Sequence, residues 1–543
     1  MPASKNQNYL HGAAILAVAV LIVKVLGAIY KIPMANIMGT KGFAHFNVAY
    51  NLYNVLLTLS TAGLPIALSK LVSEASSLDR PEQIRKTFRV ALLAFLVLGA
   101  AGSAVMFMFP TELAVFMEDV EASQSMFALA PSVVLVCVMS AFRGYTQGLS
   151  DMRPTSVSQV VETAVKVLFG IILMLVLQRR GFGTPLLAAG AISGVSVGSL
   201  VACVCIGAVA VKRMKSERFR AGALPEDACA PSDGERVILK RLVRIGIPIA
   251  LGSSVLSVIT LINTKIILGQ LQNSAGFSHD LATELFGTYS TALPLFNLPA
   301  AIITPLTISI VPAIAGFIEM KRYGDARDVI ESSLRIATII ALPMAAGLSV
   351  MAGPVMIALY GITGDGAALL ALLGAASFFV CLALMTTAIL QAGGRERLPM
   401  YTMLLGGALN IALIWFLVGR PEVNIYGAPI GTICCYAFMG GLNLWFVVRK
   451  LPERPKLSRI FLRPLLSCLA MGAAAWLVYP AALKLLGAGP EPERKLVMLA
   501  LVTAIGIAAL VYLAMTVLTG AITHADMKLL PKGEKLAKLL HIK

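Results

Sequence analysis

The sequence predicts an all-α polytopic membrane protein of about fourteen transmembrane helices, with a MATE-like fold of two parallel six-helix lobes and a C-terminal helix pair. Composition is the first observation: 58% of the 543 residues are hydrophobic, 13% are charged and the mean hydropathy is +0.82. Soluble chains usually carry about 25% charged residues. The second is segment length, since the apolar residues fall in runs of roughly 20, enough for a helix to cross a bilayer. The third is an internal repeat.

The apolar runs follow one another along the whole chain. Because lipid offers no hydrogen-bond partners to an open backbone, each run is expected to form a helix. The expected helices lie at residues 11–36, 44–70, 88–110, 125–148, 157–178, 186–211, 242–270, 284–317, 332–358, 366–391, 400–419, 425–448, 461–483 and 495–519. The first run is long, contains Lys24 and lacks a small-residue cleavage site, which indicates a retained helix rather than a secretory signal.

The net charge of +17 fits a membrane topology better than a nucleic-acid partner. With the amino terminus placed in the cytoplasm, most of the 45 Lys and Arg residues fall in loops on that side. This positive-inside pattern predicts a multi-pass cell-membrane protein with both termini in the cytoplasm. The eight cysteines form no CxxC pair, and those in apolar runs are expected to be small buried hydrophobic residues.

Two halves of the chain echo one another at an offset of roughly 240 residues. The paired stretches are Gly63-Leu64-Pro65 with Asn297-Leu298-Pro299, Gln147-Gly148 before Pro154 with Gln391–Gly394 before Pro399, and Gly190–Gly194 with Gly427–Gly431. We therefore expect lobes at 1–216 and 242–452, a cytoplasmic linker at 217–241, and a final helix pair with a cytoplasmic tail at 453–543. A substrate cavity is expected between parallel repeats.

Three lysines within apolar runs are the candidate substrate-binding residues: Lys24, Lys31 and Lys265. A charged side chain at membrane depth costs about 2.5–3.5 kcal/mol on insertion scales, so each one needs a reason. Lys24 and Lys31 are seven residues apart and share one helix face, which could attract a phosphate. In the alternative interpretation, Lys31 snorkels to the outer interface.

Polar stripes mark the second and seventh expected helices. One contains Asn47, Asn51, Asn54, Thr58 and Thr61, and the other contains Ser253, Ser257, Thr260 and Thr264 beside Lys265. Such stripes line a wet cavity or hydrogen-bond to adjacent helices, and the sequence leaves both open.

Glu162 and Lys166 are one helical turn apart, and we expect them to neutralise one another. Pro65, Pro248 and Pro299 are candidate gating hinges, although such prolines equally often only shape a helix bundle. Gly190, Gly194 and Gly198 form a small-residue seam that is expected to pack against a neighbouring helix.

The sequence contains no GxxxxGK[ST] phosphate-binding loop, and its histidines form no metal-like cluster along the chain. The expected outer loops are too short for a catalytic domain. These features favour a transporter over an enzyme and predict no cofactor or bound metal, with coupling to a monovalent ion left open.

Several stretches resemble the multidrug/oligosaccharidyl-lipid/polysaccharide (MOP) exporter superfamily, most of all its stage V sporulation protein B and MurJ-like branch. These stretches are Lys24–Gly27, Ala62–Pro65 with Ser69-Lys70, and Phe142–Gly148 continuing to Met152–Thr155. The resemblance implies a flippase that moves a lipid II-type undecaprenyl-diphosphate sugar to the outer leaflet by alternating access, driven by membrane potential or an ion gradient. It also implies a role for Lys24 in a central cationic cavity. The chain departs from the branch in having no arginine within the second or eighth expected helix.

The expected partners are the undecaprenyl-diphosphate-linked saccharide, membrane lipids and the cell-wall synthesis machinery, with no nucleic acid, and the protein is expected to be a monomer. A flippase for another lipid-linked polysaccharide, of O-antigen, teichoic or capsular type, would have nearly the same sequence features. A MATE-type multidrug exporter is a further alternative. It would need a carboxylate in the first or seventh expected helix for cationic substrates, and neither helix has one.

Overall fold

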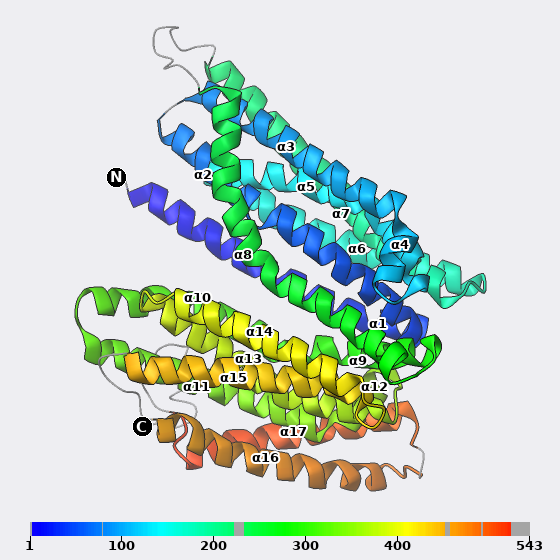
Figure 1. Ribbon diagram of the computed structural model, residues 1–543. Helices are drawn as coiled ribbons and strands as arrows, with labels where there is room; N and C mark the ends of the chain where they lie inside the picture. Colours follow the sequence, from blue (N-terminus) through cyan, green and yellow to red (C-terminus); the bar gives the residue numbers. More distant parts are fainter. Residues whose placement is uncertain (1–2, 79, 222–232, 451–456, 490–491, 523–543) are drawn as a thin grey trace. The chain divides into compact units, whose positions relative to one another are not determined.

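The computed structural model describes residues 3–78, 80–221, 233–450, 457–489 and 492–522. Every regular element in these residues is a helix (Figure 1). They form two compact units, one made of Met1–Gly269 with Ser278–Gly287 and the other of Gln270–Phe277 with Thr288–Lys543. Thirteen stretches in the described residues are long and apolar enough to cross a membrane. The protein is therefore an all-α, multi-pass membrane protein.

The first unit contains nine complete elements and the start of α9 (His279–Phe296). The complete elements are α1 (Ala3–Thr61), α2 (Leu64–Ser77), α3 (Pro81–Met108), α4 (Pro110–Phe116), η1 (Val120–Ala122), α5 (Ser123–Gly148), α6 (Arg153–Arg179), α7 (Thr184–Ala221) and α8 (Glu235–Gly269). Its apolar core joins α2, α3, α5 and α8 through side chains such as Leu68, Phe95, Tyr145 and Leu242.

Helix α1 contains the first expected transmembrane helix and most of the second, whose expected end at residue 70 lies in α2. The apolar stretch Val25–Ser77 has 53 residues, which would extend for about 80 Å as a straight helix, more than twice the thickness of a bilayer core. Gly39 interrupts it with φ 70° and ψ −178°, a conformation that favours glycine. Figure 1 shows the chain doubling back within α1, so the first two expected helices are both present and the expected total of about fourteen is compatible with the structure.

A second break separates α1 from α2, and α8 packs against it. The helix stops at Thr61 and begins again at Leu64, with Pro65 in its first turn. A Cβ atom on Gly63 would collide with the backbone of Gly246 and Ala250 in α8. Glycine is therefore needed here for close helix approach, and α8 runs along α1, α2 and α3 in Figure 1.

The glycine seam on α7 packs against the backbone of α6, as expected. A Cβ on Gly194 would meet the carbonyl oxygen of Lys166, and one on Gly198 would meet that of Glu162. The two helices therefore approach at backbone distance. This contact fixes the segment of α6 that carries Glu162 and Lys166.

The second unit contains the rest of α9 and the helices that follow. The further elements are η3 (Gln270–Ser274), α10 (Leu298–Glu319), α11 (Tyr323–Val350), α12 (Ala352–Tyr360), α13 (Asp365–Ala392), α14 (Arg397–Val418), η4 (Asn424–Tyr426), α15 (Gly427–Lys450), α16 (Leu457–Leu485) and α17 (Arg494–Leu518). Its core includes Ile303, Leu334, Met385 and Val447. The final pair, α16 and α17, pack on each other and against α11 and α12.

Candidate functional site

A cavity of about 500 Å³ lies inside the first unit, among α1, α2, α5, α6 and α7. This volume is within the range of roughly 300–1,000 Å³ that is usual for ligand pockets. Aromatic and apolar side chains form much of the wall, together with a few polar groups. The charged and amide-bearing residues that line it are Arg143, Gln147, Gln159, Glu162 and Lys166. Two of these are cationic and one is anionic, so the lining has a net positive charge.

Arg143 and Glu162 form an ion pair on one wall of the cavity. Arg143 Nη2 donates to Glu162 Oε2 at 2.9 Å, and its Nε donates to Ser158 Oγ at 3.0 Å. Ser199 of α7 donates to the other carboxylate oxygen at 3.2 Å. Since only 14% of the Arg143 side chain and 22% of the Glu162 side chain are exposed, each charge needs its partner. The pair joins α5, α6 and α7 and leaves that wall electrically neutral.

Lys166 supplies the positive charge that this pair does not cancel. Its Nζ lies 5.8 Å from the ring centre of Tyr50, which also lines the cavity, and this distance allows a cation–π interaction. The expected pairing of Lys166 with Glu162 is wrong, because Glu162 pairs with Arg143. Spacing along the sequence indicates only partners on the same helix, whereas the Arg143 guanidinium that pairs with Glu162 comes from α5.

Lys31 is one of the lysines expected to bind substrate, and its charge interacts with that of Lys166. It is half-buried, and its ammonium group is close enough to that of Lys166 for the two charges to repel. Lys31 and Lys166 therefore place two positive charges in and beside the cavity. An anionic ligand would relieve their repulsion.

The structure does not bring the other two candidate lysines into this site. Lys265 Nζ lies 3.5 Å from the ring centre of Phe116 in α4, and Lys265 does not line the cavity. The Lys24 side chain lies outside the described part of the chain. Substrate binding by Lys24 and Lys265 stays a prediction.

The polar stripes of α1 and α8 hydrogen-bond to one another. Asn51 Nδ2 donates to Thr264 Oγ1 at 2.9 Å, and the hydroxyls of Thr58 and Ser257 lie 3.0 Å apart. The Asn47 side chain is buried and donates to the Phe43 carbonyl at 2.7 Å. Two turns further along α1, the Asn54 carbonyl accepts a hydrogen bond from the Thr58 hydroxyl. Asn51 and Thr58 thus show the contact between helices, while Thr61 at the end of the α1 stripe lines the cavity. For the other stripe residues, a role in lining a cavity stays a prediction.

The candidate hinge prolines occupy two kinds of position. Pro65 and Pro299 each stand in the first turn of a helix directly after a break, and Pro65 also lines the cavity. Pro248 lies inside α8, which continues on both sides of it. Two of the three thus mark interruptions where motion would be possible, and gating itself stays a prediction.

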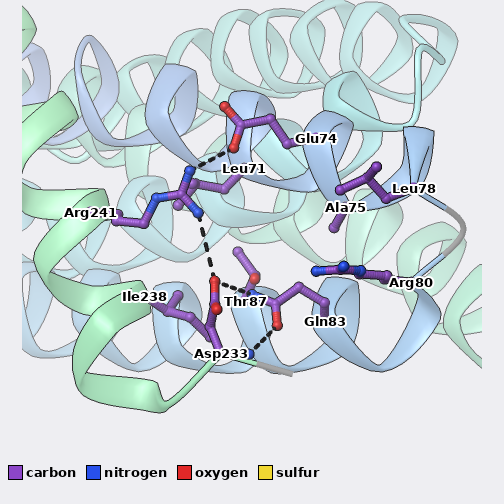
Figure 2. Close-up of a pocket in the computed structure, with 10 residues that line it drawn as sticks. All are labelled: Leu71, Glu74, Ala75, Leu78, Arg80, Gln83, Thr87, Asp233, Ile238 and Arg241. Atoms are coloured by element: carbon purple, nitrogen blue, oxygen red, sulfur yellow. Dashed lines mark hydrogen bonds and ion pairs between the residues drawn. The ribbon is translucent and has the colours of Figure 1, made fainter. Parts of the chain in front are cut away.

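A second, much smaller pocket of about 60 Å³ lies where α8 begins, against α2 and α3. Figure 2 shows the Arg241 guanidinium between two carboxylates, 2.8 Å from Glu74 and 3.6 Å from Asp233. Gln83 accepts from the Asp233 backbone N–H at 2.7 Å. The volume suits water rather than a substrate, and the charged groups neutralise one another. This pocket is a tie between the start of α8 and the helices beside it.

Sequence reasoning missed Arg143 and Lys166 as site residues. Arg143 stands in the Phe142–Gly148 stretch on which the resemblance rests, close to the end of the expected helix 125–148. The spacing of Lys166 and Glu162 predicts mutual neutralisation and so gives no reason to place Lys166 in a binding site. Arg143 and Lys166 could both be identified from the free-energy cost of a charge at membrane depth, since that cost applies equally to the two side chains.

The model of the family described as "Polysaccharide biosynthesis protein" matches residues 9–318. Three curated proteins of Bacillus subtilis (strain 168) are similar to this chain. Uncharacterized membrane protein YabM is 26% identical over 97% of this chain and 96% of its own length. Stage V sporulation protein B is 26% identical over 83% and 86%, and Lipid II flippase MurJ is 23% identical over 79% and 81%.

Solved structures share the fold. The lipid II flippase MurJ in an inward closed conformation superposes with a TM-score of 0.68 at 13% identity, covering 93% of this chain and 98% of that one. An inward-facing multidrug resistance MATE family transporter of the MOP superfamily gives 0.63 at 16% identity, covering 80% and 98%. The expected MOP-type fold is confirmed.

Proposed function

Because the chain belongs to the polysaccharide biosynthesis protein family, within the MOP exporter superfamily, we propose that it is a flippase for a lipid-linked cell-wall precursor. The substrate in this proposal is of lipid II type, an undecaprenyl-diphosphate sugar that moves from the cytoplasmic to the outer leaflet by alternating access. Similarity to stage V sporulation protein B and to Lipid II flippase MurJ supports it. In this proposal both termini lie in the cytoplasm.

The net positive cavity of the first unit is the observation that carries the proposal. A diphosphate in a low-dielectric interior needs cationic partners, since an unpaired buried charge is strongly disfavoured. Lys166 supplies one and Lys31 stands nearby. Arg143 uses Nε and Nη2 on Ser158 and Glu162, and a guanidinium has further N–H groups that can face a phosphate.

The remaining polar lining suits a sugar. Gln147 and Gln159 offer amide donors and acceptors, and the Gln159 Oε1 atom is buried without a hydrogen-bond partner in the structure. Tyr50 and Tyr53 of α1 add aromatic side chains to the lining. An amide–aromatic lining of this kind can bind hydroxyls and ring faces of a saccharide.

The same geometry argues against a drug exporter for organic cations. Glu162 is the carboxylate of the cavity, and Arg143 and Ser199 already occupy its two oxygens. A cationic drug would have to displace Arg143 and would also face Lys166. A carrier for anionic head groups fits these charges better.

Depletion of the protein in its host, followed by analysis of the lipid-linked precursors on the cytoplasmic leaflet, tests the function. Accumulation of lipid II would support the lipid II-type substrate. Accumulation of a different undecaprenyl-linked glycan would assign the protein to that polysaccharide instead, and no accumulation of either would overturn the proposal.

The site is tested by binding and rescue. We expect Lys166→Gln to weaken binding of the precursor by about 10- to 100-fold, because a hydrogen bond to a charged group contributes about 1.5–3 kcal/mol. Lys24→Ala and Lys265→Ala are compared in the same assay. The control is Lys240→Gln, an exposed lysine of α8 outside the cavity. Equal affinities of Lys166→Gln and the control would remove the cavity from the mechanism.

A further inference from the structure

Four titratable side chains meet at the end of the first unit where α1 doubles back. His45 lies in α1, Asp119 and Glu121 lie at the start of η1, and His279 opens α9. All four belong to the first unit. They come from three separate segments of the chain, and they do not line the cavity described above.

His45 is held between two carboxylates. Its Nδ1 lies 2.9 and 2.8 Å from the two oxygens of Asp119, and its Nε2 lies 3.0 Å from Glu121 Oε2, close enough for an ion pair although not aligned for a hydrogen bond. The His45 and Asp119 side chains are 1% and 0% exposed. His279 Nε2 stands 3.7 Å from Asp119 Oδ1. The Asp119 carboxylate is thus buried with two imidazoles beside it.

The carboxylates on both sides of His45 match the positive charge of an imidazolium. A neutral imidazole has one N–H and one acceptor nitrogen, so one of its two nitrogens would face a carboxylate lone pair without a proton between them. The imidazolium hydrogen-bonds to Asp119 through Nδ1 and at the same time places its positive charge beside the Glu121 carboxylate. Histidine is the side chain whose ordinary titration falls between about pH 5 and 8.

The surrounding charges do not replace that proton. Lys41 of α1 lies 3.5 Å from Asp280 of α9, so its charge is compensated by a different carboxylate. Glu118, one residue before Asp119, adopts φ 62°, a left-handed conformation that is unfavourable for a non-glycine residue. This left-handed residue lies in the turn that brings the Asp119 side chain into contact with His45.

We propose that His45, Asp119, Glu121 and His279 form a proton-binding site that latches the start of α9 to α1 and η1. A proton on His45 completes the ion pairs and keeps the latch closed. Its loss leaves the buried Asp119 carboxylate short of a positive partner, which favours opening and hydration. Glu121 and His279 are 48% and 35% exposed, and they give the proton a route to water.

The latch acts on the helix at which the chain passes from one unit to the other. Residues up to Gly287 of α9 belong to the first unit and those from Thr288 to the second. A Cβ on Gly287 would overlap the backbone of Thr40, so this stretch also approaches α1 closely. Proton binding here would bias the freedom of α9 whatever substrate the protein carries.

Hydrogen–deuterium exchange of the full-length protein in lipid nanodiscs, measured between pH 5.5 and 8, tests the latch without any transported lipid. The closed state binds more protons than the open state, so low pH favours closure and rising pH favours opening. After correction for intrinsic exchange, the opening equilibrium constant of peptides spanning 39–49 and 278–287 should rise by up to about tenfold per pH unit for each proton released.

His45→Gln has no proton to gain or lose at the centre of the cluster, so its exchange in these peptides should show far less dependence on pH. Asp119→Asn should have the same effect and serves if the first variant does not fold. Lys41→Gln is the matched control, because it removes a neighbouring charge that does not titrate in this range and should keep the wild-type dependence. Wild-type exchange independent of pH, or a dependence that survives both His45→Gln and Asp119→Asn, would overturn the proposal.

Discussion

Arg143 shows how a single residue couples the fold to the site. Its guanidinium bonds to Ser158 and Glu162 of α6, and Ser199 of α7 completes the carboxylate's partners. The same guanidinium lines the cavity. Removing one charge therefore affects two properties: the packing of three helices and the net charge presented to a ligand.

We expect the Arg143–Glu162 pair to be strongly non-additive. Arg143→Gln leaves a carboxylate without its cation, and Glu162→Gln leaves the reverse, whereas the double Gln variant removes both charges. A double-mutant cycle on thermal unfolding in detergent should give a coupling of about 1–2 kcal/mol. This is less than the 3–5 kcal/mol lost when a fully buried pair is broken, since both side chains border a wet cavity. Additive losses would show that the pair does not stabilise the unit.

Lys265 shows what a sequence cannot reveal at this scale. Its position in an apolar run predicts a functional charge, and the structure places that charge on the ring of Phe116. Phe116 ends the short helix α4 in a segment far away along the chain. The free-energy cost of a charge at membrane depth identifies which side chains need a partner, but the identity of the partner depends on tertiary packing.

At the scale of elements, Gly63 is the point where a helix break and a helix contact coincide. We expect Gly63→Ala to lower the stability of the protein by about 1–3 kcal/mol, the usual cost of overpacking, because its Cβ would meet backbone atoms of α8 that cannot rotate away. The matched control is Gly252→Ala in α8, where an added Cβ has no neighbour within 4 Å. Thermal unfolding of both variants measures the difference, and equal melting temperatures would contradict it.

Helix α8 has features that the sequence predicts and tertiary contacts that the sequence does not predict. Its existence and polar stripe follow from the sequence, as does the small-residue seam of α7, whereas α8 begins at Glu235 rather than at the expected residue 242. The contacts of α8 with α1, α2 and α3 do not, since they combine a glycine contact at Gly63 with hydroxyl and amide pairs such as Thr58–Ser257 and Asn51–Thr264. Each partner is about 200 residues away, and periodicity along one helix contains no information on which distant helix it faces.

Across the whole molecule, the repeat that the sequence suggests coincides with equivalent helix breaks. Leu64-Pro65 opens α2 after one break, and Leu298-Pro299 opens α10 after another. Gly148 ends α5 and Ala392 ends α13, each before a short turn to a new helix. The predicted boundaries of the lobes, with the first ending at 216 and the second starting at 242, stay a prediction.

The orientation of the molecule in the membrane follows from charge and from the number of spans together. Basic loops are retained in the cytoplasm, and an odd number of expected spans separates the turn at Arg180 from the turn at Glu396. These two exposed positions should therefore lie on opposite sides, Arg180 outside and Glu396 inside. In a variant with the eight cysteines replaced by alanine, a membrane-impermeant maleimide on intact cells should label Arg180→Cys and spare Glu396→Cys until the cells are permeabilised. Labelling of both from outside would contradict the span count. The reverse pattern would invert the topology, and the substrate would then enter the net positive cavity from the other leaflet.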